Sequence, residues 1–117
     1  MNFERTYSYS IIKTFSHGNW VTQVAWNEDL LATGSLDKTV KLWNTESDSA
    51  LQSLAHGGNI NAIQWAPSEG HMSGYLATAC DDGYVRIWLA KEGHEAIKVG
   101  CRKESLKFNF KLFPWLF

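Results

Sequence analysis

The sequence predicts an all-β fold built from two copies of one unit. The stretch Leu30 to Asn44, LLATGSLDKTVKLWN, returns in register as Tyr75 to Leu89, YLATACDDGYVRIWL. In each copy an apolar run, an Asp at a turn and a second run that contains Trp indicate two short strands around a tight turn. Asp37 and Asp82 lie 45 positions apart (82 minus 37), within the period of about 40 to 45 residues of four-stranded propeller blades. We therefore expect a partial β-propeller of about two four-stranded blades plus flanking strands.

The first unit divides into short alternating segments. A leading segment, Tyr7 to Phe15, alternates well enough to predict a strand that precedes the unit. The four strands of the unit itself are expected at Val21 to Trp26, Leu30 to Gly34, Val40 to Asn44 and Ala50 to Leu54.

The second unit begins with a strand at Ile60 to Trp65 and then contains an insertion. The separation from His to Asp is 20 positions in the first unit (37 minus 17) and 26 in the second (82 minus 56). The six extra residues fall around the Gly/Ser-rich stretch 68–74, which predicts a surface loop.

After the second Trp the pattern weakens. Residues 95–99 are expected to form a fourth strand, and the clean alternation of Leu106 to Leu112, LKFNFKL, predicts a further one. The terminal FPWLF is apolar. We expect a lead-in over 1–10, two repeats over about 11–54 and 55–99 of the segment 11–99, and a divergent apolar tail over 100–117.

Each unit also carries a His ahead of its first strand, His17 before VTQVAW and His56 before INAIQW. With the Asp, Val and Trp spacing, this pattern resembles the WD40, or transducin-β, repeat family. Ser-His and Ala-His stand where the family usually has Gly-His, and Trp43-Asn44 and Trp88-Leu89 stand where it has Trp-Asp. The position of the insertion and the residues of the repeats also have a fainter similarity to transducin-β-like corepressor subunits.

The resemblance implies a structural role for eight residues. In the family a His, a Thr or Ser on the second strand, the turn Asp and the Trp form a hydrogen-bonded chain that must be completed, because each unpaired buried polar group costs about 1 to 3 kcal/mol. Carried over, the two tetrads are His17, Thr33, Asp37 and Trp43, and His56, Thr78, Asp82 and Trp88.

Other chemistries compete poorly with this interpretation. Ser35 near His17 and Asp37 suggests a hydrolytic triad, but these residues stand where a blade needs them, so we expect no enzyme and no catalytic residue. The His and Cys residues lack the close pairs of a metal site, so no metal and no cofactor is expected.

Composition sets the broad class. The chain has 117 residues, of which 44% are hydrophobic, and a net charge of −1. We expect an intracellular protein, cytoplasmic or nuclear, because Cys80 and Cys101 are too few for a disulfide framework and no secretory segment follows Met1. No membrane role is expected, since the apolar runs fall short of about 20 residues. The basic stretch with Phe108 and Phe110 could contact nucleic acid, but a protected strand edge is favoured, so no nucleic acid is expected.

We therefore expect a non-catalytic scaffold, as a fragment or truncated member, that binds a protein or peptide. The alternatives are a degenerate chain without independent function and a subunit of a chromatin or corepressor-type assembly. Self-association or complementation by another chain would close the propeller. An exposed Trp would anchor a partner, although Trp20 could instead pack on a neighbouring blade. The family's top-face positions correspond to Trp20, Thr22, Leu36, Asn59, Asn61 and Asp81.

Overall fold

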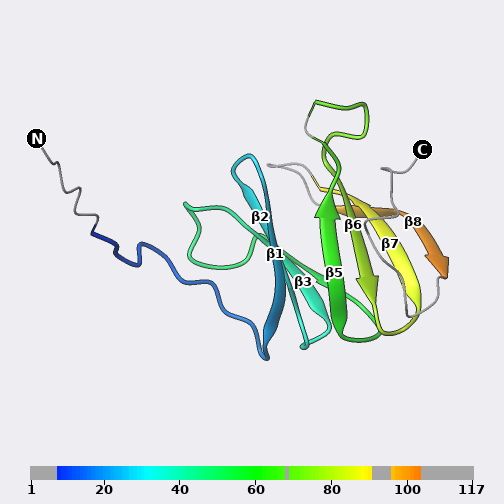
Figure 1. Cartoon of the computed structure of the whole chain (residues 1–117), viewed down its shortest axis with the longest axis horizontal. Coiled ribbons are helices and arrows are strands. Elements are labelled where there is room, and N and C mark those ends of the chain that lie inside the picture. Colours follow the sequence, from blue (N-terminus) through cyan, green and yellow to red (C-terminus); the bar gives the residue numbers. More distant parts are fainter. Residues whose placement is uncertain (1–7, 68, 91–95, 104–117) are drawn as a thin grey trace, which may run out of the picture.

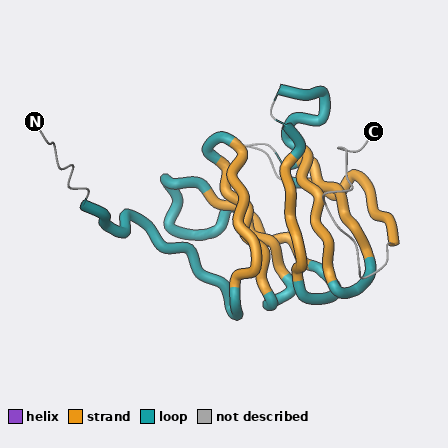
Figure 2. Tube along the Cα trace, viewed as in Figure 1, coloured by secondary structure: helices purple, strands orange, loops and turns teal. Residues whose placement is uncertain are grey.

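Two four-stranded antiparallel sheets make up the protein, as a computed structural model describes it for residues 8–67, 69–90 and 96–103. Figure 1 and Figure 2 show the two sheets next to each other, with no helix in the described part of the chain. Each sheet has its strands in sequence order, so every connection is a simple hairpin. We call the two sheets blade 1 and blade 2. Blade 1 contains β1 (Val21–Asn27), β2 (Leu30–Ser35), β3 (Thr39–Trp43) and β4 (Gln52–Ala55); blade 2 contains β5 (Ile60–Trp65), β6 (Tyr75–Cys80), β7 (Tyr84–Leu89) and β8 (Ile97–Lys103).

This architecture confirms the predicted all-β fold with two four-stranded units. The inner strands form where the sequence alternates or runs apolar between turn signals. The turns need a left-handed backbone at equivalent places: Lys38, between β2 and β3, has φ 72°, and Gly83, between β6 and β7, has φ 84°. Glycine adopts this conformation without the steric penalty that lysine meets, so the second turn is the less strained of the two.

The innermost strand of each blade carries the same irregularity. The register shifts between Val21 and Gln23 in β1 and between Ile60 and Ala62 in β5, so that Thr22 and one residue of β5 are extra. The Thr22 hydroxyl lies within hydrogen-bonding distance of the Gly34 carbonyl (3.2 Å) in its own blade and of the Ile60 carbonyl (2.8 Å) in blade 2. The first bulge therefore links the blades.

The core lies between the blades, where β1 and β2 pack against β5. Gly34 lies so close to blade 2 that a Cβ atom there would be 2.6 Å from Ile60 Cγ2, which is why this position has no side chain. Two polar contacts add to the apolar packing. Trp65 Nε1 donates to the Ala25 carbonyl (3.0 Å), and Gln52 bonds the main chain of Ala96 through both its amide atoms.

Two strand predictions were wrong. Residues 8–15 form no strand. In Figure 1 they extend outward from blade 1, which Lys13 and Phe15 contact through side chains only: Lys13 Nζ donates to the Thr45 carbonyl (3.1 Å) and the Phe15 ring lies 4.8 Å from that of Trp43. The fourth strand of blade 2 begins at Ile97 and continues to Lys103, not 95–99, because β7 offers partners as far as Tyr84. The strand expected at 106–112 lies outside the described residues.

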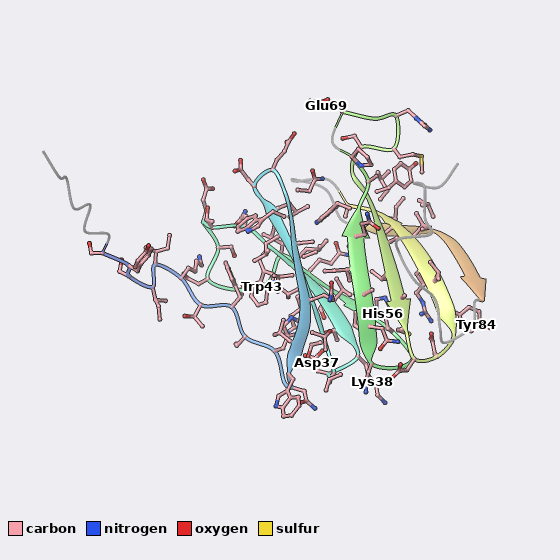
Figure 3. The ribbon with its side chains drawn as sticks, in the orientation of Figure 1. Asp37, Lys38, Trp43, His56, Glu69 and Tyr84 are labelled. Carbon is pink, nitrogen blue, oxygen red and sulfur yellow. The ribbon has the colours of Figure 1, made fainter. Side chains whose placement is uncertain are left out.

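The predicted insertion is confirmed as a loop. Described residues of the segment 67–74 make successive turns, and Ala66 and Tyr75 close the hairpin below them with a bond of 2.9 Å. Figure 3 shows Glu69, in this loop, at the opposite end of the molecule from Asp37 and Lys38. In the described ranges, no helix is long and apolar enough to cross a membrane.

Candidate functional site

A chain of hydrogen bonds crosses blade 1 from its core to its β2–β3 turn. Trp43 Nε1 donates to the Thr33 hydroxyl (2.8 Å), the hydroxyl bonds His17 Nε2, and His17 Nδ1 bonds Asp37 Oδ2 (2.9 Å). A carboxylate at neutral pH only accepts, so His17 Nδ1 donates to Asp37. The structure thus joins all four residues of the first predicted tetrad by hydrogen bonds.

Asp37 gathers further donors at the turn. The amides of Gly18 (3.0 Å) and Thr39 (2.9 Å) donate to its carboxylate, as does the Thr39 hydroxyl. Burial by itself would raise the pKa of Asp37, but the bonds from Thr39, His17 and Gly18 outweigh it and hold that pKa well below its usual value. The charged carboxylate therefore fixes the turn to the loop before β1.

Blade 2 repeats two of the three links. Trp88 Nε1 donates to the Thr78 hydroxyl (3.0 Å), and this hydroxyl lies 2.7 Å from His56 Nε2. The other ring nitrogen, Nδ1, donates to the Leu54 carbonyl (3.0 Å). Burial of the imidazole lowers the pKa of His56 to about 4, because an apolar setting disfavours the charged ring.

The third link predicted for the second tetrad is absent, since Asp82 does not bond His56. Its carboxylate instead receives both guanidinium nitrogens of Arg86, at 2.6 and 3.2 Å, and the Cys80 thiol at 2.6 Å. Arg86 occupies the position that Lys41 has in blade 1 (86 minus 45). Its planar guanidinium group can donate two hydrogen bonds to a carboxylate four residues away. The Arg86 bonds hold the pKa of Asp82 far below its usual value.

This ion pair is the feature that sequence reasoning missed. The available signal was an Arg four positions after an Asp, on the same hairpin. Cys80 belongs to the same cluster, and burial is the main cause that raises the pKa of its thiol. The thiol is therefore a buried hydrogen-bond donor, not a nucleophile.

Ser35 does not complete a hydrolytic triad. Its hydroxyl accepts from the Asp37 amide (3.0 Å) and donates to the Asn19 carbonyl (3.3 Å), and the residue is fully buried. Both ring nitrogens of His17 already face other partners, so no nucleophile and base are paired here. In the part of the chain that the structure describes, no group of three or more His, Cys, Asp and Glu side chains could hold a metal ion.

The six predicted partner-binding positions lie where strands meet turns at one end of the blades, the end at which Figure 3 labels Asp37 and Lys38. We call these positions the top surface. Trp20 is 77% exposed, so it does not pack on a neighbouring blade, and its carbonyl accepts from the Leu36 amide (2.9 Å). Leu36 is half-buried beside it.

The blade 2 part of the top surface is polar. The Asn59 carbonyl accepts from the Asp81 amide (2.9 Å), the same link that joins Trp20 and Leu36 in blade 1. Asn61 donates its side-chain amide to the Asp81 carboxylate (2.7 Å), and both side chains are exposed. Thr22 differs from the rest, because its hydroxyl is used between the blades.

Comparisons with known proteins agree with this geometry. The WD40 family, described as "WD domain, G-beta repeat", matches residues 9–44 and 49–88. Over 99 residues the chain is 25% identical to "Ribosome biogenesis protein WDR12 homolog" of Trichoplax adhaerens, covering 85% of this chain and 23% of that protein. Over 102 residues it is 31% identical to "THO complex subunit 3" of Arabidopsis thaliana, covering 81% of this chain and 31% of that protein.

The chain is also similar to a solved structure, the computationally designed Ika4 protein, with a TM-score of 0.63 at 18% identity over 84% of this chain and 59% of that one. This likeness concerns the fold alone. The chain spans less than a third of the length of each of the two relatives above. Two matched repeats, with the bonds from Trp through Thr to His in both blades, place the chain in the WD40 repeat family.

Proposed function

We propose that the chain is a non-catalytic interaction scaffold that binds a protein or peptide partner through its top surface. The observation that carries this proposal is Trp20, a large aromatic side chain that is 77% exposed next to the half-buried Leu36. Exposed indoles flanked by apolar side chains are typical anchors of protein interfaces, because burying them removes much apolar surface from water.

The polar part of the surface would supply orientation. The Asp81 carboxylate is held by Asn61 at 2.7 Å and remains exposed, so it can accept a hydrogen bond from a partner without losing its own support. A partner that places an apolar group on Trp20 and a donor on Asp81 would fit both halves. The proposal also gives the two repeats the bounds of about 11–54 and 55–99, so that each repeat carries one half of the top surface.

The named relatives support the general class. One is a complex subunit and another a ribosome biogenesis protein by name, and both names favour work within protein assemblies inside the cell. The kind of assembly, including the chromatin or corepressor type that the sequence left as an alternative, stays a prediction.

The proposal is tested by affinity capture with the full chain and three variants. Trp20→Ala and Leu36→Ala should each reduce recovery of the captured partner at least tenfold, whereas Leu51→Ala should not. Leu51 is a matched control, because it is an exposed apolar residue (45%) ahead of β4, away from the top surface. Unchanged recovery with both top-surface variants would show that the partner binds elsewhere.

A further inference from the structure

The loop before β1 is bonded to the β2–β3 turn (residues 35–39) through each of its residues, 17–20. His17 Nδ1 and the Gly18 amide both bond the Asp37 carboxylate, at 2.9 and 3.0 Å. The carbonyls of the next two residues accept hydrogen bonds from the turn, at 3.3 and 2.9 Å. The loop on the blade 1 half of the top surface is therefore fixed to its turn.

The equivalent loop of blade 2, residues 56–59 (39 positions later), keeps one of these bonds. The Asn59 carbonyl accepts from the Asp81 amide at 2.9 Å. In the described part of the chain, the other three loop residues make no hydrogen bond to the equivalent turn, residues 80–84. Most of the connections between loop and turn are therefore absent from blade 2.

Distance does not explain the absence of these bonds. A Cβ atom at Gly57 would lie 2.6 Å from Asp82 Oδ2, and one at Gly58 would lie 3.0 Å from the Asp82 nitrogen. At Gly18, the nearest turn atom to such a Cβ would be Asp37 Cβ, at 3.8 Å. The loop of blade 2 lies closer to its turn than the loop of blade 1 does, so the cause must lie in the partners that Asp82 already has.

Three positions of the hairpin supply those partners. Ser35, Thr39 and Lys41 of blade 1 are replaced, 45 positions later, by Cys80, Tyr84 and Arg86. The serine hydroxyl reaches the loop, whereas the thiol donates to Asp82 at 2.6 Å. The lysine donates to a carbonyl outside its turn, whereas the guanidinium donates to Asp82 at 2.6 and 3.2 Å. The Tyr84 ring, whose centroid lies 5.5 Å from Arg86 Cζ, supports the guanidinium in this place. The donors that fill the Asp82 carboxylate thus belong to its own hairpin.

We propose that Gly57 and Gly58 form an adjustable segment of the top surface, which Arg86 releases from the β6–β7 turn by holding Asp82 inside the hairpin. Glycine reaches backbone conformations that other residues avoid, so this pair can change shape at low steric cost. A partner on the top surface would meet a fixed loop in blade 1 and an adjustable loop in blade 2, beside Asn59. The inference goes beyond the proposed function, since it concerns bonds within the chain and holds whether or not the top surface binds a partner.

Amide hydrogen exchange measured by NMR on the full chain tests the proposal without any variant. Gly18 and Gly57 are a matched pair, because both follow a histidine and both are exposed. The Gly18 amide is protected by its bond to Asp37, so the Gly57 amide should exchange about tenfold or more faster. Equal exchange rates would overturn the proposal.

Arg86→Lys tests the cause, because it places the residue of blade 1 in blade 2 and keeps the positive charge. The Asp82 carboxylate should then turn to the loop, so exchange of the Gly57 amide should slow about threefold or more, while that of Gly18 stays unchanged. A substitution that merely loosened the hairpin would speed up exchange at Gly57, so the sign of the change separates the two roles. Faster or unchanged exchange would refute the role of Arg86.

A variant with all three residues of blade 1, Cys80→Ser/Tyr84→Thr/Arg86→Lys, separates Arg86 from its neighbours. It should bring the exchange rate of the Gly57 amide within about threefold of the Gly18 rate. Slower exchange in this variant but not in Arg86→Lys would assign the release to the thiol or the tyrosine, against the proposal. Unchanged exchange in both variants would show that the loop is loose for a reason outside the hairpin.

Discussion

Thr33→Val isolates the hydrogen-bonded chain of blade 1, because valine keeps the shape of threonine and removes its hydroxyl. The hydroxyl accepts from Trp43 Nε1 at 2.8 Å and bonds His17 Nε2, and Thr33 and Trp43 are both 4% exposed. The variant leaves two buried nitrogen atoms, Trp43 Nε1 and His17 Nε2, without this partner, at about 1–3 kcal/mol each. The extra buried methyl offsets about 1 kcal/mol. The free energy of unfolding should fall by about 3 kcal/mol.

Urea unfolding at neutral pH, followed by Trp fluorescence and far-UV circular dichroism, measures this change. Thr33→Ser is the control, because serine keeps the hydroxyl and loses one methyl, which costs about 1 kcal/mol. The valine variant should therefore be less stable than the serine variant by about 2 kcal/mol. A difference under about 0.5 kcal/mol would show that the hydroxyl contributes little and that the chain of bonds does not stabilise the blade.

Three further changes probe other contacts. Gly34→Ala should destabilise by about 1–3 kcal/mol through overpacking, and the loss should vanish in an Ile60→Ala background in a double-mutant cycle. Arg86→Gln should cost about 1–3 kcal/mol in urea unfolding by leaving its carboxylate partner uncompensated, and Arg86→Lys should cost less. Because the pKa of His56 is lowered to about 4, the imidazole takes up its proton in the unfolded chain before the folded chain as pH falls below about 6.5. The free energy of unfolding should therefore drop by up to about 3 kcal/mol by pH 4. His56→Gln should flatten this pH dependence in urea unfolding, and His71→Gln should not.

The sequence predicted the strands best where apolar periodicity and turn residues agree. The stretch from Leu30 to Trp43 carries both signals, and its two strands and turn form as expected. Residues 8–15 carry only the alternation. Alternation says which side chains would share a face, but a strand also needs an edge to pair with, and no sequence pattern within the segment can supply that edge.

The tetrads show the same limit at the level of single bonds. The resemblance to the WD40 family predicted that Thr78, Trp88 and His56 meet, because a repeat fixes their places on one hairpin and the loop before it. It gave Asp82 the wrong partner, since several donors lie within reach and the charge-assisted bonds from Arg86 are the stronger ones. Arg86 supplies two such bonds and His56 then turns to a neutral carbonyl.

Comparison of the two repeats distinguishes differences caused by the sequence of a blade from differences caused by the blade packed against it. Asp37 and Asp82 have the same place and turn, so their different partners follow from Lys41 and Arg86, which differ in sequence. Val24 and Ile63 are both aliphatic, so their different exposure follows from what covers them. The difference between the partners of Asp37 and Asp82 is thus explained by residues of their own blades. The difference in exposure depends on the neighbour, because blade 1 covers Ile63 and no described element covers Val24 in the same way.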